Sequence, residues 1–521
     1  MKSMKSMLMG GAILLGLAMC LTSCEGTLDD IFGEWSRPTG NNGNTKTTVA
    51  VKSVTLDQTT LTKAVGDDAV TLTATVDPSD ASDKTVTWKS SDASIAAVDA
   101  NGKVTFVAAG TATITATATN GTDDTADDKT AECAVTVNAA AVPVTSLTLD
   151  QTMKVIKLGG DALTITATVT PSDATDKSVT WTSDDPNIAT VDNGVVTPKA
   201  LGIATITAKS GDVKATCEVF VGNVVDLSSE PSDYSAADYD ILTGTLSPMN
   251  HINILGRKVA FDGMAADNIE CFYDVTIYLT DGKTNTVNEH QSAPANVAGI
   301  QIGGAGTTLT INAETAGTGI LNVTGGDDGA GIGTGWAFSS NIEGGNITIN
   351  GGVINATAGK WNGGAAGIGT GYASNATNTC GAITINGGTV TATGGDASGV
   401  GGAGIGTGGA NANSGSTSNT CGAITINGGT VTATGAQRAT GIGTGTSYDR
   451  GAAANNTCGA ITIGTGVTKV TAKKGDGAAW CIGKGPGYNS ATTNCGTITI
   501  GGVVKAQSEF KGATYTYIPS N

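Results

Sequence analysis

Histidine is nearly absent from this chain, and basic residues are few. The 521 residues include 2 histidines and 28 lysines and arginines against 45 acidic residues, which gives a formal net charge of −17. Nucleic acids and anionic membrane surfaces attract clustered lysine and arginine, so this charge argues against both as partners. Catalysis by histidine would require His251 or His290, and neither lies near a recognisable nucleophile or partner acid in the sequence.

Aromatic residues are scarce at 4%, and the 76 glycines follow no collagen-like Gly-X-Y period. Glycine at about twice its usual share of ~7% without that period indicates turns in a repetitive fold. A hydrophobic content of 39%, rich in valine, isoleucine and threonine, predicts a packed all-β interior rather than disorder. At roughly 150 residues per domain, the length suggests about three or four domains.

Long apolar runs are missing apart from one near the N-terminus. Residues 7–21 form an apolar run that follows two lysines and is too short to span a bilayer comfortably, as in a secretory signal. The run ends in the letters "LTSC" at 21–24, which resemble the lipobox of bacterial lipoproteins. The resemblance implies a signal peptide at 1–23 and acylation of Cys24. A plain secretion signal is the alternative.

Residues 24–48 are mostly polar and contain asparagine, glycine and threonine, which predicts a flexible tether. Acidic residues crowd its start, and this resembles the surface-export signals of some Gram-negative lipoproteins. The resemblance implies a lipid-anchored protein of the outer membrane, exposed at the cell surface and held to the membrane through its lipid. Display on the inner or the outer leaflet stays open.

Two segments, 49–139 and 143–222, alternate apolar and polar residues in short runs between turn-forming residues. This pattern predicts an antiparallel β-sandwich in each. Trp88 and Trp181 occupy the same place in the two copies, and we expect both in the core rather than on a ligand platform. In each copy an isoleucine follows the tryptophan after 7 residues and a valine follows after 3 more.

The letters "VDPSDASDKTVTWKSSDASIAAVDANGKV" with "AAGTATITA", and their counterparts in the second copy, resemble the bacterial immunoglobulin-like domain of group 2. Such domains occur in intimin- and invasin-type adhesins. The resemblance implies spacers that present another part of the protein at a distance, and a fold alone does not define an activity.

From 227 to 521 the sequence is periodic, and its repeat is near 37 residues. Fifteen identical letters, "CGAITINGGTVTATG", begin at Cys380 and again at Cys421. Each period contains three short runs compatible with strands, and none could bury its apolar face alone. We therefore predict a right-handed parallel β-helix with three sheets, in which like residues stack on like residues in successive coils. Its column would contain the isoleucines of the repeat, with Ile383 next to Ile424.

Two further columns follow from this stacking. Asn350, Asn386 and Asn427 start "NGG" turns, and their amides are expected to form a ladder. The repeat also aligns four cysteines, for which a stack of buried thiols and one or two disulfides are both open. Zinc is not expected, because no Cys-x-x-Cys pair or nearby histidine completes a tetrahedral set. The four cysteines are Cys380, Cys421, Cys458 and Cys495.

The "GAGIGTG" and "CGAITINGGTVTATGG" units resemble glycine-rich β-helix modules, some of them labelled carbohydrate-binding, in surface proteins of gut-type bacteria. The resemblance implies an adhesin that binds glycans or other cell-surface ligands. Late departures suggest a less regular C-terminal cap: Lys484 replaces the threonine of "GTG", and "GTGVTKV" replaces "NGG" at 464–470.

Aromatic residues in the loops after the "GIGTG"-like stretches are the candidate glycan-binding residues, because exposed rings stack on sugar faces. The alternative is that these rings cover aliphatic coil surface. The candidates are Trp336, Tyr372, Tyr448 and Tyr488.

Three acids in "GD" turns, Asp327, Asp396 and Asp476, recur at similar places in separate coils, which is typical of structural turns rather than of a catalytic cleft. We predict a non-enzymatic surface adhesin without catalytic residues, metal ion or cofactor. A passive structural surface protein is the second hypothesis, and a polysaccharide-degrading enzyme is the third.

Overall fold

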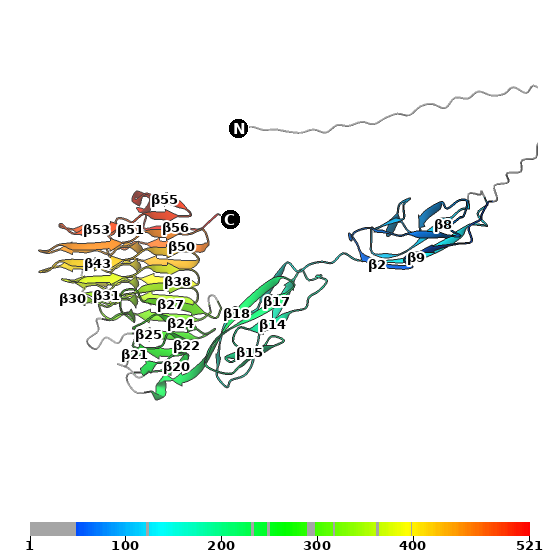
Figure 1. Cartoon of the computed structure of the whole chain (residues 1–521). Helices are drawn as coiled ribbons and strands as arrows, with labels where there is room; N and C mark the ends of the chain where they lie inside the picture. Colours follow the sequence, from blue (N-terminus) through cyan, green and yellow to red (C-terminus); the bar gives the residue numbers. More distant parts are fainter. Residues whose placement is uncertain are drawn as a thin grey trace, which may run out of the picture. The chain divides into compact units, whose positions relative to one another are not determined.

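The structure is a computed structural model that describes residues 48–120, 124–230, 234–246, 251–288, 297–315, 318–360, 364–397 and 399–520. It is an all-β protein with two compact units, Met1–Ala140 and Ala141–Asn521, and each is considered by itself (Figure 1). Cys24, the predicted signal peptide and the predicted tether up to residue 47 lie outside the described residues. Within the described part of the chain, no helix has the length and apolarity needed to cross a membrane.

The first unit is the predicted sandwich. Its sheets pair in the orders β2-β9-β8-β5, β3-β7-β6 and β1-β4, and Leu72, Ile114 and Cys133 are buried between them. The strands are β1 (Ser53–Leu56), β2 (Thr60–Ala64), β3 (Val70–Thr71), β4 (Ala74–Asp77), β5 (Val86–Ser90), β6 (Ala96–Val98), β7 (Lys103–Phe106), β8 (Gly110–Ala118) and β9 (Lys129–Asn138).

The second unit opens with the same sandwich. Its strands are β10 (Ser146–Leu149), β11 (Met153–Lys157), β12 (Leu163–Thr164), β13 (Ala167–Thr170), β14 (Thr180–Ser183), β15 (Ala189–Asp192), β16 (Val195–Pro198), β17 (Gly202–Ser210) and β18 (Val213–Asp226). As predicted, Trp88 and Trp181 pack against the cores of their copies. A Cβ on Gly102, which has φ +80°, would lie 2.7 Å from the Trp88 ring, and one on Gly194 would lie 3.2 Å from Trp181. Both copies therefore need a glycine at the place where the chain passes the tryptophan ring.

Strand β18 belongs to both the second sandwich and the β-helix. Its first part pairs with β17 and β11, and its last residues, Asn223 to Asp226, pair in parallel with β20 (Asp240–Thr245). The predicted boundary between 222 and 227 therefore falls inside one continuous strand. The short 3₁₀ helix η1 (Leu227–Ser229) follows it, and the Asp226 carboxylate accepts the Ser228 N–H at its start.

The rest of the chain coils into a parallel β-helix (Figure 1). Two ladders of one sheet carry most of its core. The first ladder contains β22 (Lys258–Ala266), β24 (Val275–Leu279), β27 (Thr308–Ala313), β32 (Asn346–Ile349), β37 (Ile383–Ile385), β44 (Ile424–Ile426), β49 (Ile461–Ile463) and β54 (Ile498–Ile500). The second contains β25 (Thr284–Asn288), β28 (Ile320–Thr324), β33 (Val353–Thr357), β38 (Thr389–Thr393), β45 (Gly429–Thr434) and β50 (Val467–Lys473).

A third ladder runs through the "GIG" segments. It contains β19 (Tyr234–Ala236), β21 (His251–Ile254), β23 (Asn268–Cys271), β26 (Ile300–Ile302), β29 (Ile332–Gly333), β34 (Ile368–Gly369), β41 (Ile405–Gly406), β46 (Ile442–Gly443) and β51 (Ile482–Gly483). These three ladders correspond to the three predicted runs. The predicted isoleucine column is confirmed, because Ile383 is the register partner of Ile424 and both are fully buried.

Two more ladders occupy stretches that the sequence analysis left as loops, so three sheets per coil was an underestimate. The fourth ladder contains β30 (Ala337–Phe338), β35 (Ala373–Ser374), β42 (Ala410–Ala412), β47 (Ser447–Asp449) and β52 (Gly487–Tyr488). The fifth contains β31 (Ile342–Glu343), β36 (Thr377–Cys380), β43 (Thr417–Cys421), β48 (Ala454–Cys458) and β53 (Thr492–Cys495). A two-stranded hairpin is formed by β39 (Asp396–Ala397) and β40 (Val400–Gly401), which pair antiparallel.

Polar columns accompany the aliphatic one. The predicted asparagine ladder is confirmed: Asn386 donates to the Asn350 side chain at 2.9 Å, and Asn427 donates to Asn386 at 2.9 Å. A second, buried asparagine column crosses β43 and β48, where Asn419 and Asn456 donate to backbone carbonyls at 3.0–3.1 Å. Each buried side-chain amide thus donates hydrogen bonds to two backbone carbonyl groups.

The C-terminal end of the β-helix is irregular, as the late departures from the repeat suggest. The register between β45 and β50 shifts at Gly429, where "GTGVTKV" replaces "NGG". Beyond the last coil, β55 (Val503–Lys505) and β56 (Thr514–Tyr517) pair antiparallel with β54 and β50, and η2 (Gln507–Phe510) lies between them. Buried Phe510 closes the aliphatic column.

Candidate functional site

Two of the predicted aromatic residues, Tyr448 and Tyr488, belong to the fourth ladder, and Trp336 and Tyr372 directly precede its strands β30 and β35. Its register places Tyr448 of β47 directly beside Tyr488 of β52. Their rings stack with centroids 4.5 Å apart and an interplanar angle of 10°. Both side chains are partly exposed, so the pair offers an aromatic surface to solvent. Each ring covers one face of the other, so a sugar could stack only on a face that points away from the pair.

Two arginines flank this stacked pair. The Arg438 guanidinium lies 5.2 Å from the centre of the Tyr488 ring and donates a hydrogen bond to the Tyr448 hydroxyl. The Arg450 guanidinium lies 5.7 Å from the centre of the Tyr448 ring. Cation–π contacts hold the rings in place and leave arginine N–H donors beside them, which can bind hydroxyl or carboxylate groups of a ligand.

The sequence analysis missed both arginines. Arg438 precedes the "GIGTG"-like stretch rather than following it, and Arg450 is an exposed residue of a loop without any repeat. The repeat could have indicated them, because in a chain with few basic residues both fall within one coil and close to Tyr448. The contact itself depends on how the loops fold over the coil.

The other two candidates form a separate cluster. The Trp336 ring lies 4.9 Å from that of Phe338 and 6.4 Å from that of Tyr372, between centroids. Tyr372 is only 4% exposed, and burial raises the pKa of its hydroxyl to about 12. Its ring therefore covers the coil, whereas Phe338, which the sequence analysis did not select, is 54% exposed.

The four candidates thus occupy two clusters rather than one continuous platform. In the coil between the clusters, β42 places Asn411 at the register position that Tyr448 occupies in the next coil. Asn411 is 7% exposed. The cluster around Tyr448 and Tyr488 combines aromatic rings with cationic donors, and it is the better candidate for binding a polar ligand.

The three turn acids do not form a metal site. Asp396 and Asp476 are exposed, while Asp327 is partly buried, and burial raises its pKa. Among the described residues, no group of three or more histidine, cysteine, aspartate or glutamate side chains is placed to hold a metal ion.

The cysteine column exists, and its thiols are free. Cys380, Cys421, Cys458 and Cys495 are successive register partners in the fifth ladder. The first three are buried, and Cys495 is partly exposed. The adjacent Cys421 thiol and burial hold the pKa of Cys380 well above its usual value. Of the two possibilities that the sequence left open, the structure has the stack of thiols.

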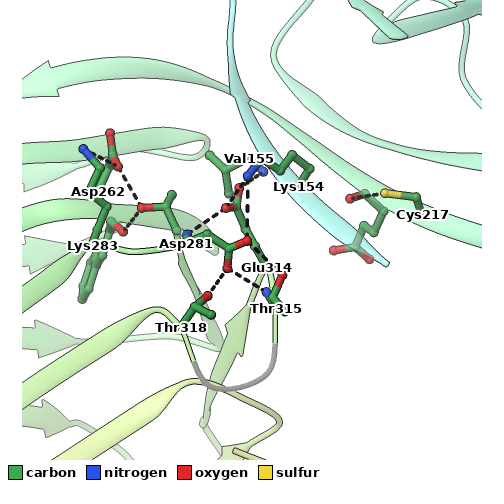
Figure 2. A network of polar contacts seen from close by, with 12 residues as sticks. Lys154, Val155, Cys217, Asp262, Asp281, Lys283, Glu314, Thr315 and Thr318 are labelled. Atoms are coloured by element: carbon green, nitrogen blue, oxygen red, sulfur yellow. Dashed lines mark hydrogen bonds and ion pairs between the residues drawn. The ribbon is translucent and has the colours of Figure 1, made fainter. Parts of the chain in front are cut away.

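A polar network joins the second sandwich to the β-helix (Figure 2). The Glu314 carboxylate follows β27 and is 3% exposed. It accepts hydrogen bonds from the Lys154 ammonium at 2.9 Å and from the Val155 N–H at 2.5 Å, both on β11. It also accepts the Asp281 N–H at 2.8 Å. One buried carboxylate therefore fixes β11 to the coil.

The network continues to Asp281 and Lys283. Burial opposes ionisation of Asp281, but hydrogen bonds from Thr318 and Thr315 and the Lys154 charge together lower its pKa. Lys283 lies 3.6 Å from the Asp262 carboxylate in a more exposed pair. These side chains line a cleft of 490 Å³ between β11 and the first coils. The ion pairs of Lys154 with Glu314 and of Lys283 with Asp262 help to hold the two parts together, and Lys157 and Asp161 line the same cleft outside these pairs.

An apolar cluster completes this junction. The Phe220 ring of β18 lies 5.1 Å from that of Tyr278 and 5.7 Å from that of Tyr239, between centroids. Met153 of the sandwich and Ile241 of β20 are buried in the same cluster. The shared strand, the buried ion pair and this cluster together make the second sandwich and the β-helix one body.

A domain model described as Bacterial Ig-like domain (group 2) matches residues 50–128 and 143–219. An uncharacterized protein of Clostridium acetobutylicum is 40% identical over 159 residues, which are 30% of this chain and 16% of that protein. An Ig-like virion protein of Serratia phage KSP90 is 37% identical over 216 residues, which are 40% of this chain and 81% of the virion protein. An alpha-L-arabinofuranosidase of Bifidobacterium longum is 41% identical over 127 residues, 24% of this chain and 11% of the enzyme.

Solved structures with some likeness include domains 4 and 5 of the S-layer protein SbsC, with 22% identity, a TM-score of 0.18, and coverage of 33% of this chain and 99% of that one. Human protocadherin-24 EC1-2 has 13% identity and a TM-score of 0.22, and the match covers 33% of this chain and 99% of the protocadherin chain. TM-scores this low support no statement about function. The virion protein is covered over most of its length and the domain model matches twice, so this chain belongs to the family of proteins with group 2 bacterial Ig-like domains.

Proposed function

We propose that this protein is a non-enzymatic, adhesin-like surface protein whose β-helix binds glycans of host or neighbouring cells. The observation that carries the proposal is the stacked pair of Tyr448 and Tyr488 with Arg438 and Arg450 beside it. A preformed stack loses little conformational entropy when a flat sugar face packs on it. The arginine N–H groups supply donors for hydroxyl or carboxylate groups of the sugar.

In this proposal the two Ig-like domains are spacers, and the acylated Cys24 anchors the chain to the outer membrane. The match to an Ig-like virion protein supports a role in surface presentation, because that protein belongs to a virus particle. The arabinofuranosidase match covers 11% of the enzyme and gives no support for catalysis. Rigid attachment of the second sandwich to the β-helix suits a spacer, since it holds the binding edge away from the anchor.

A glycan array tests the proposal. We expect the full chain to bind a subset of glycans, and Tyr488→Ala together with Arg438→Met to reduce that binding at least about tenfold, as expected when a stacked ring and a charged donor are both lost. Tyr273→Ala is the matched control, because Tyr273 is a tyrosine of another coil that is 55% exposed. It should leave binding unchanged.

Two outcomes would contradict the proposal. Absence of binding to any glycan would favour the passive structural hypothesis. Binding that survives the double substitution would place the ligand elsewhere on the protein. Release of reducing ends from plant or host polysaccharides would instead support the enzyme hypothesis.

A further inference from the structure

The cysteine column ends at an accessible thiol. Cys380, Cys421 and Cys458 are buried, but Cys495, in the last coil, is partly exposed. Cys495 also lines a pocket of 380 Å³ formed by β53, β54 and the C-terminal cap. The end of the column therefore opens to solvent through a defined cavity, while its inner thiols are shielded.

The pocket is basic within an acidic protein. Lys484 and Lys505 line it, and none of the described residues that line it carries a carboxylate. The Lys505 ammonium forms an ion pair with the Glu509 carboxylate at 3.2 Å. The Lys484 ammonium lies 5.8 Å from the centre of the Trp480 ring. Lys484 is the residue that replaces the repeat threonine, so this coil departs from the pattern where it adds a cation to the pocket that Cys495 lines. Such a pocket favours anionic ligands.

Cys495 is also the terminal acceptor of the column. The Cys458 thiol beside it lowers the pKa of Cys495, although burial opposes the shift. A larger thiolate fraction makes a cysteine the attacking group in thiol–disulfide exchange. In the same column, the pKa values of Cys380 and Cys458 are raised well above the usual value. The column thus has one reactive end.

Cys458 lies close enough to Cys495 to act as the resolving cysteine, which is the thiol that attacks the first mixed disulfide. It is the register partner of Cys495 on the adjacent parallel strand. Adjacent strands are about 4.8 Å apart, which lies within the range of roughly 4.4–6.8 Å between the α-carbons of disulfides. A disulfide between these two residues therefore needs side-chain rotation and little backbone movement.

We propose that Cys495 and Cys458 form a redox-active dithiol that reduces small disulfides carrying carboxylate groups. The Cys495 thiolate attacks one sulfur of the disulfide, whose S–S bond breaks, and the first thiolate leaves and takes up a proton from solvent. Cys458 then loses its proton to solvent and attacks the Cys495 sulfur, and the second thiolate leaves and also takes up a proton from solvent. The substrate gains two electrons and becomes two thiols, and the protein holds one disulfide. This activity is independent of glycan binding.

The test uses the full chain with Cys20→Ser and Cys24→Ser, so that N-terminal thiols do not contribute. The probe is an aromatic disulfide with a carboxylate on each ring, whose released thiolate absorbs visible light. We expect two thiolates per protein, and peptide mapping by mass spectrometry should find the Cys458–Cys495 disulfide. Cys458→Ala should release one thiolate and retain half of the probe as a mixed disulfide on Cys495. Cys495→Ser should release thiolate much more slowly than the parent protein, because it lacks the attacking group.

Two controls separate this site from general thiol reactivity. Cys380→Ala removes a buried thiol of the same column and should leave the reaction unchanged. Lys484→Met should slow the first step by roughly threefold to tenfold with the anionic probe and leave the rate with neutral hydroxyethyl disulfide unaltered, because only the anion is steered. Circular dichroism checks that each variant is folded.

The proposal is overturned if the first adduct in the parent protein maps to another cysteine. It is also overturned if the probe stays attached to Cys495 and no disulfide forms between Cys495 and Cys458. Both outcomes are observed on the parent protein, so neither depends on a variant that might misfold.

Discussion

At the scale of single residues, the repeated "GIG" glycines are a steric requirement of the coil. Gly406 has φ +134°, and a Cβ placed on it would lie 1.8 Å from the Gly443 carbonyl oxygen of the next coil. Gly369 and Gly443 show the same approach, at 1.8 and 1.9 Å. These contacts are with backbone, which has no rotamer to relieve them. In the coils of Gly369, Gly406 and Gly443 this position of the third ladder therefore requires glycine, whereas the earlier coils have Asn253, Glu270 and Gln301 at the same register position.

This geometry predicts a large effect of a single methyl group. Gly406→Ala should destabilise the β-helix by about 3 kcal/mol or more, since backbone strain and a backbone clash combine. The measurement is urea denaturation followed by circular dichroism. Gly502→Ala is the control, because Gly502 has φ +78° but a Cβ placed on it would meet nothing within 4 Å. It should cost only about 1 kcal/mol, and equal losses in the two variants would refute the steric argument.

Burial of single residues could be predicted from the sequence where the alternation of apolar and polar residues along a strand alone determines it. Alternation placed Ile424 and Ile426 inward, and both are fully buried. It failed for Tyr372, which the sequence could not distinguish from Tyr448 because both follow the same motif. The difference arises from the coil that each one covers: Tyr372 is overlaid by its neighbours, whereas Tyr448 meets Tyr488 and two arginines.

At the scale of elements, the junction depends on one strand and one carboxylate. Strand β18 continues from sandwich to coil, and Glu314 ties β11 to the same coil. Glu314 is nearly inaccessible, while Lys154 is 27% exposed by its side chain. Removing the carboxylate leaves the N–H groups of Val155 and Asp281 without their acceptor, and it leaves the Lys154 ammonium with only the Asp281 carboxylate, 4.0 Å away.

We therefore expect Glu314→Ala to destabilise the second unit by about 3 kcal/mol, the usual cost of breaking a buried pair. The second sandwich should then unfold in a separate transition at lower urea concentration. Lys283→Met is the matched control, because it breaks a pair whose lysine side chain is 52% exposed. That change should cost less than about 1 kcal/mol. A Glu314→Ala variant that keeps a single transition at the parent midpoint would exclude this role.

Sequence analysis found three of the five ladders of a complete coil. The missed ones lack an alternation of large hydrophobic residues: β43 and β48 each bury an asparagine, Asn419 and Asn456, and these amides bond to the backbone of the coil. Periodicity searches detect aliphatic alternation, so a buried polar ladder appears as a loop. The repeated "NTC" letters before each "GAITI" unit were the available signal, since identical stacking applies to asparagine as it does to isoleucine.

At the scale of the whole molecule, a parallel β-helix must protect both ends of its column, because an open coil exposes unpaired backbone and apolar side chains. The C-terminal end is covered by β55, β56 and η2. The first coil is covered differently, by the last residues of β18, which pair with β20. The second Ig-like domain therefore serves as a cap of the β-helix in addition to any role as a spacer.

This cap predicts which fragment of the chain is stable. A fragment of residues 141–521 retains β18 and should be monomeric with one cooperative melting transition. A fragment of residues 227–521 begins where the predicted boundary lies, but it loses β18 and the Phe220 contacts with Tyr278 and Tyr239. The open edge of β20 should then pair with other chains, which lowers the melting temperature and produces oligomers in light scattering. If the shorter fragment stays monomeric and melts at the same temperature as the longer one, β18 is not the cap and the two parts are independent domains.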